Sequence, residues 1–120
     1  MAQTTEQKRA AHAWEKARAG VQGHKKEYVN TAKGLPALIM NSGLMQVMAF
    51  LRGKGGRHDA LGGHLRDWLH QQCGTPREFA AFMEHLLEAK PHEFQRITAE
   101  AFAWLKWLRQ MAAAVNQEEA

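Results

Sequence analysis

The chain has 120 residues, 45% apolar and 23% charged, a composition typical of a folded domain rather than a disordered chain. No apolar run approaches the roughly 18 residues of a membrane-spanning helix, and the first nine residues lack the apolar region of a signal peptide. A single cysteine, Cys73, excludes an internal disulfide and a cysteine-based zinc cluster and is expected to be an inert thiol. We therefore expect a soluble cytoplasmic protein with one all-helical domain over residues 1–120, frayed at 1–4 and 116–120.

The net charge of +4 is distributed unevenly along the chain. Residues 1–58 carry ten basic and three acidic residues, a net +7, whereas residues 59–120 carry six basic and nine acidic residues, a net −3. A cationic surface attracts polyanions, so the first half is the candidate for nucleic-acid binding. A solvated helix face is the competing explanation for the same charges.

Helical periodicity dominates the chain, and β-branched residues never alternate over the length of a strand. The first helix is predicted over residues 5–32, with Gly20 and Gly23 as weak points where the helix can bend. Its apolar stripe comprises Ala10, Trp14, Ala17, Val21, Tyr28 and Ala32. Its polar side carries Lys8, Arg9, His12, Lys16, Lys26 and Lys33.

Proline and glycine residues, which interrupt helices, divide the middle of the chain into short segments. Pro36 suits the first turn of a short helix over 36–40. A strongly apolar helix over 44–51, including Phe50, is predicted to form the centre of the core. The three glycines and three bases of residues 52–57 predict a flexible basic loop.

The second half predicts further helices. One covers 60–72, and a second follows Thr75, which fits an N-cap with Pro76 in the first turn and Glu78 as the capping-box partner. Residues 91–97 form a short helix or a turn, and Thr98 caps a last helix that continues to about residue 115. Together these elements predict an all-α fold, a compact bundle of about five to six helices. Long N-terminal and C-terminal helices surround a short apolar central helix.

Residue types used in catalysis and metal binding are present without the necessary spacing. His64 and His70 lie about 240° apart on a helix, so they cannot face one ion together with Asp67. Glu84 and Glu88 are explained by a solvated helix face. We therefore expect no catalytic residue, no metal, no cofactor and no small-molecule substrate, and the protein is predicted not to be an enzyme.

Two groups of residues remain as candidates for binding. Trp104 is in phase with the apolar stripe of the last helix and is predicted to lie in the core, whereas Trp107 and Phe102 flank it and are candidates for a subunit interface. The candidate contacts to nucleic-acid phosphates lie on the first helix and the basic loop. They are Lys16, Arg18, Lys25, Lys26, Lys33, Arg52, Lys54 and Arg57.

Residues 33–51 read KGLPALIMNSGLMQVMAFL. This segment resembles the small all-helical subunit of the Cmr (type III-B) CRISPR RNA-guided effector complex. That family has a leucine-proline-alanine-x-isoleucine turn followed by a glycine-leucine-x-glutamine-x-x-alanine-phenylalanine-leucine helix. Segments 13–28 and 98–112 agree in order, so the resemblance spans nearly the whole chain. Ser42, in place of a common asparagine, and Gln110-Met111, in place of a basic-phenylalanine pair, depart from the family pattern.

The resemblance implies a non-catalytic subunit of an antiviral ribonucleoprotein. Members of the family stack in several copies beside crRNA-binding subunits and line the channel where target RNA pairs with the guide. The implied partners are other Cmr subunits, copies of this chain, and crRNA or target RNA bound through phosphates, with no membrane. Two other functions stay open from the residues alone, a helical protein-interaction module and a helical DNA-binding regulator.

Overall fold

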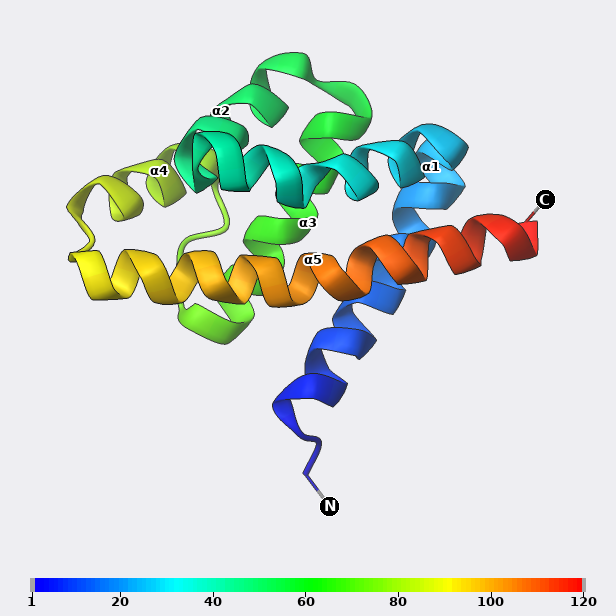
Figure 1. Ribbon diagram of the computed structural model, residues 1–120, viewed down its shortest axis with the longest axis horizontal. Helices are drawn as coiled ribbons and strands as arrows, with labels where there is room; N and C mark the ends of the chain where they lie inside the picture. Colours follow the sequence, from blue (N-terminus) through cyan, green and yellow to red (C-terminus); the bar gives the residue numbers. More distant parts are fainter. Residues whose placement is uncertain (1, 120) are drawn as a thin grey trace.

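Five helices form the computed structural model, which describes residues 2–119, and no strand occurs among these residues. They are α1 (Thr5–Ser42), α2 (Leu44–Lys54), α3 (Gly56–Cys73), α4 (Phe79–Glu88) and α5 (Pro91–Glu119). The predicted all-α fold is confirmed, with five helices among the described residues. In Figure 1, α5 and the second half of α1 extend along the long axis, and α3 crosses them.

The core lies where α1, α3 and α5 meet. Trp68 from α3, Trp104 from α5 and Tyr28 from α1 are its largest fully buried side chains. The prediction that Trp104 lies in the core is therefore confirmed. Helix α2 packs on α1 and α3, and α4 packs on α2 and α3. None of the helices in the described part of the chain is long and apolar enough to cross a membrane.

Helix α1 begins at a capping box. The Thr4 hydroxyl accepts from the backbone N–H of Gln7, and the Gln7 side chain accepts from the backbone N–H of Thr4, so Thr4 is held at the helix start. The helix continues to Ser42 with Pro36 inside it. The predicted separate helix over 36–40 was therefore wrong. Proline removes only one N–H donor, and the buried side chains of Leu35 and Ile39 hold both sides of it in place.

The break in α1 occurs at Lys25. This residue has φ 53° and ψ −135°, a conformation that interrupts the helical hydrogen bonds and turns the chain. Beyond the break, the Tyr28 ring packs directly against Gly20, where any Cβ would overlap the ring. The Tyr28 hydroxyl lies 2.8 Å from His64 Nδ1 on α3. Gly20, Tyr28 and His64 therefore fix the angle between the two halves of α1.

The junctions of the later helices differ from those predicted. Residues 52–57 do not form a flexible loop, because Arg52–Lys54 complete α2, Arg57 lies in the first turn of α3, and Gly55 with φ 69° joins the two helices. Glu78 caps α4 by accepting from the N–H groups of Ala80 and Ala81. Thr75, the predicted cap, is fully buried and its hydroxyl has no partner among the described residues.

Helix α5 is one continuous element. It begins at Pro91, so Thr98 is an internal residue and not the predicted cap. Residues 116–119, which we expected to be frayed, continue the helix, and Ala120 lies outside the described residues. The buried positions Ile97, Ala101 and Trp104 show why the helix starts early, since its apolar stripe already faces the core within two turns of Pro91.

Candidate nucleic-acid interface

Lysines without acidic partners gather around the break in α1. Lys25 lies at the break, and Lys26 and Lys33 follow it seven residues apart, which places them on one helix face about 10.5 Å apart. All three are exposed, and no carboxylate lies within 4 Å of their ammonium groups among the described residues. Their charge is therefore available to a polyanion.

The α2–α3 junction carries two further cations. Arg57 of α3 lies 3.1 Å from Glu27 of α1, and this ion pair brings the junction against the second half of α1. Lys54 ends α2 just before the junction, and its ammonium lies 5.7 Å from the centre of the Phe50 ring. We call Lys25, Lys26, Lys33, Lys54 and Arg57 the kink cluster.

Three other predicted phosphate contacts, Lys16, Arg52 and Arg18, lie outside the kink cluster. Lys16 is partly buried and lies 3.7 Å from Asp67 of α3. Arg52 lies 3.4 Å from Asp59 and over the Phe79 ring. Arg18 lies over the Trp14 ring, in a hollow that Val115 and Glu118 of α5 also line. The structure thus leaves Lys25, Lys26 and Lys33 without an acidic partner among the described residues and pairs Lys16, Arg52 and Arg57 with carboxylates.

Trp14 and His12 occupy the opposite sides of α1 from those predicted. Trp14 was assigned to the apolar stripe but is 40% exposed, whereas His12 was assigned to the polar side but is buried. His12 Nδ1 accepts from Trp104 Nε1 at 2.9 Å, and its Nε2 therefore carries the proton and donates to Asp67 at 2.8 Å. Burial lowers the pKa of His12 although Asp67 opposes the shift. These bonds, rather than apolarity, bring His12 into the core.

Asp67 and Glu100 hold the helices that carry the cluster. Burial opposes ionisation of Asp67, but hydrogen bonds from His12 and Arg77 and the charge of Lys16 outweigh it and lower its pKa to about 2. Glu100 of α5 accepts from Arg9 of α1 at 2.6 and 2.9 Å and from Trp68 of α3 at 3.1 Å. Each carboxylate therefore links separate helices by charge-assisted hydrogen bonds.

The histidines of α3 bond to separate parts of the protein. Tyr28 donates to His64, since burial raises the pKa of the phenol and lowers the pKa of His64 to about 4. His70 Nδ1 instead lies 2.8 Å from the Thr75 carbonyl. Among the described residues, no three histidine, cysteine or acidic side chains form a metal-binding group. Burial raises the pKa of the Cys73 thiol, which lowers its reactivity.

The predicted interface residues lie at the edge of the core. Trp107 and Phe102 are both half-buried and pack against core residues of the same protein. Part of each side chain is accessible to a second molecule, so their role at a subunit contact stays a prediction.

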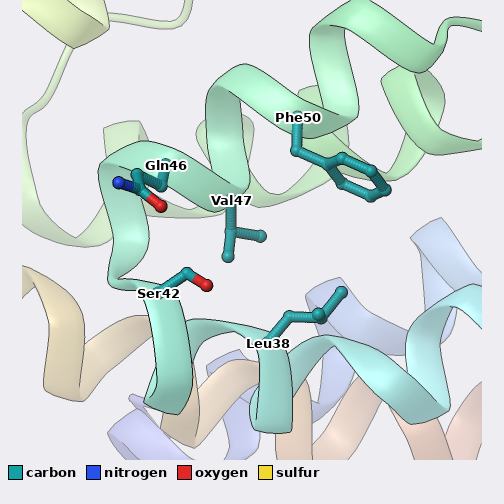
Figure 2. A pocket seen from close by; sticks show the side chains of 5 residues that line it. All are labelled: Leu38, Ser42, Gln46, Val47 and Phe50. Atoms are coloured by element: carbon teal, nitrogen blue, oxygen red, sulfur yellow. The ribbon is translucent and has the colours of Figure 1, made fainter.

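An apolar groove lies between the end of α1 and the start of α2. In Figure 2, Leu38 and Ser42 from α1 face Gln46, Val47 and Phe50 from α2 across it. Phe50 is 44% exposed, so its predicted place in the core was wrong. Helix α2 is apolar around much of its surface, and hydrophobic periodicity alone does not distinguish its outer side from its inner side.

The fold and this surface define the class of protein, a small all-α protein with an exposed basic face at a helix break. The sequence model of the family described as "CRISPR-associated protein (Cas_Cmr5)" matches residues 5–115. The chain is similar to the "CRISPR system Cmr subunit Cmr5" of Thermus thermophilus, with 32% identity over 111 residues, 91% of this chain and 93% of that protein.

Comparison of structures agrees with the sequence match. The crystal structure of a CRISPR-associated Cmr5 family protein from Thermus thermophilus aligns with a TM-score of 0.80 and 33% identity, covering 95% of this chain and 98% of that one. This chain belongs to the Cmr5 family of CRISPR-associated proteins. The resemblance found at residues 33–51 is therefore confirmed.

Proposed function

We propose that this chain is a non-catalytic small subunit of a cytoplasmic type III-B CRISPR ribonucleoprotein that acts in antiviral defence. It stacks with copies of itself beside other Cmr subunits and contacts crRNA or target RNA along the channel. The observation that carries the RNA contact is the kink cluster, whose lysines have no acidic partners among the described residues. Family membership supports the place in a Cmr complex.

The kink cluster binds phosphates and reads no bases. Lys26 and Lys33 lie seven residues apart on one face of α1, Lys25 lies at the break itself, and Arg57 is held at Glu27 beside it. A cation that neutralises a phosphate releases condensed counterions, so affinity comes from charge and falls with salt. Lys16, Arg52 and Arg57 contribute less than the three lysines, because Asp67, Asp59 and Glu27 neutralise them. Arg18 lies over the Trp14 ring, away from the break in α1.

Charge reversal tests this function in the assembled complex. The triple variant Lys25→Glu, Lys26→Glu, Lys33→Glu removes the phosphate contacts and leaves the core intact, since all three side chains are exposed. Reconstituted with the other Cmr subunits, it is expected to assemble like the wild type but to retain less target RNA. The matched control reverses three exposed cations elsewhere, Lys90, Lys106 and Arg109.

Other outcomes identify other functions. Failure of the triple variant to assemble would mean that the basic face binds acidic protein neighbours, as a protein-interaction module does. Sequence-dependent binding of duplex DNA by a stable homodimer would indicate a DNA-binding regulator. The stacking contact is tested separately by Trp107→Ala and Phe102→Ala, which are expected to reduce the number of copies incorporated per complex.

A further inference from the structure

The groove of Figure 2 has dimensions suited to one ring system. Its volume is about 190 Å³, below the roughly 300–1,000 Å³ of pockets for drug-sized ligands. Leu38 on one wall is 41% exposed and Phe50 on the other is 44% exposed, so both walls are accessible from solvent. A flat group can enter between α1 and α2 without displacing either helix.

The lining combines an apolar surface with a small number of polar groups. Leu38, Val47 and Phe50 supply the apolar surface, and the Ser42 hydroxyl and Gln46 amide supply donors and acceptors at one end. An unpaired nucleobase has the matching chemistry, with two apolar faces and a polar edge. Aromatic side chains stack on such faces in proteins that bind single strands.

The charge at the rim of the groove favours a nucleotide over a protein side chain. Lys54 lies one turn beyond Phe50 on α2, and its ammonium lies 5.7 Å from the ring centre. None of the five residues that line the groove is acidic. Lysine is depleted in protein–protein interfaces relative to the rest of the surface, whereas each nucleotide of an RNA strand carries a phosphate that a cation can neutralise. His58 contacts the Phe50 ring edge-on at 5.9 Å and limits its movement.

We propose that this groove binds an unpaired base of single-stranded RNA. The base stacks on Phe50, its edge bonds to Gln46 or Ser42, and its phosphate lies at Lys54. This site rests on the proposed RNA-binding function and adds to it a contact that depends on the base. Lys54 lies at the rim of the groove, beside Phe50, and is also a member of the kink cluster, so one RNA strand can contact both.

Two oligonucleotides separate base binding from phosphate binding. The purified full chain is titrated with a uridine 20-mer and with an abasic oligomer that has the same number of phosphates, by fluorescence anisotropy. Phe50→Ala is expected to weaken binding of the uridine oligomer about tenfold and to leave the abasic oligomer unchanged. Phe50→Trp is expected to retain binding, and Lys54→Gln to weaken both oligomers equally. Met40→Ala, an exposed apolar residue outside the groove, is the control.

The inference is overturned if Phe50→Ala binds the uridine oligomer as the wild type does, or loses affinity equally for both oligomers. It is also overturned if Phe50→Ala keeps full RNA affinity but fails to enter the reconstituted complex, since the groove would then hold a protein side chain. A wild type that binds neither oligomer would contradict the proposed function itself. If the wild type binds both oligomers and Phe50→Ala changes neither affinity, the base-binding site in the groove is rejected and the proposed RNA-binding function is retained.

Discussion

Substitution of Gly20 tests the physical basis of the break in α1. Alanine in place of glycine within a helix normally stabilises by about 1 kcal/mol. At position 20, however, the new Cβ would overlap the Tyr28 ring, which is fully buried and bonded to His64. Overpacking costs about 1–3 kcal/mol, and separating the buried hydroxyl from His64 costs about 1–3 kcal/mol more. After the gain of about 1 kcal/mol is subtracted, Gly20→Ala is therefore expected to lower the free energy of unfolding by about 3 kcal/mol.

Gly23 on the same helix provides the matched control. A Cβ at position 23 meets no atom within 4 Å, so Gly23→Ala is expected to stabilise by up to about 1 kcal/mol. Urea unfolding followed by circular dichroism at 222 nm measures both variants. If Gly20→Ala proved as stable as Gly23→Ala, the packing of Tyr28 on Gly20 could not be what fixes the break.

Three further predictions concern the buried polar groups. Because burial lowers the pKa of folded His64 to about 4 from an ordinary 6.5, the unfolded chain binds more protons between these values and stability falls as pH drops. Between pH 6.5 and pH 5 the free energy of unfolding, measured with urea, is expected to fall by about 1.5 kcal/mol. His64→Gln is expected to make this fall smaller. Glu100→Ala is expected to lower the free energy of unfolding by about 3 kcal/mol, because it leaves Arg9 and Trp68 without their acceptor. Glu84 is exposed, so the control Glu84→Ala should change the free energy of unfolding by less than about 0.5 kcal/mol in the same assay. Thr75→Val removes a buried hydroxyl that has no partner among the described residues. It is expected to raise the free energy of unfolding by about 1 kcal/mol, which is measured as a higher thermal midpoint.

The periodicity of the apolar residues and the positions of the helix-breaking residues predicted the helices and most of the core. The stripe that includes Ala17, Val21 and Ala32 is buried, and α3 and α4 lie close to their expected positions. Glycines with positive φ end the helices at positions 43, 55 and 74. These features depend on residues within one or two turns of each other, and so are readable from sequence.

The remaining features depend on contacts between distant residues. The break at Lys25 exists because Tyr28 packs on Gly20 and bonds to His64, 36 residues further along the chain. His12 is buried because Trp104 and Asp67 satisfy both ring nitrogens. Gly20 and Gly23 indicated that this part of α1 can bend, but neither the position of the break at Lys25 nor the bonds of His12 can be read from nearby residues.

The candidate site was predicted in outline only. The charge imbalance between the two halves indicated the correct region, but could not show that Asp67 and Asp59 neutralise Lys16 and Arg52. The exposure of Phe50 was also not predictable, because it depends on which side of α2 the rest of the protein covers. That Lys25, Lys26 and Lys33 have no acidic partner among the described residues depends on the ion pairs of the folded protein.

The salt dependence of RNA binding tests the central claim most directly. For wild type, the logarithm of the association constant is expected to fall linearly with the logarithm of the salt concentration, with a slope near −0.7 per phosphate contact on a single strand. Loss of the contacts of Lys25, Lys26 and Lys33 should make the slope of the triple variant shallower by about 2. The control triple at Lys90, Lys106 and Arg109 should keep the wild-type slope, and an unchanged slope for the first triple would contradict the account.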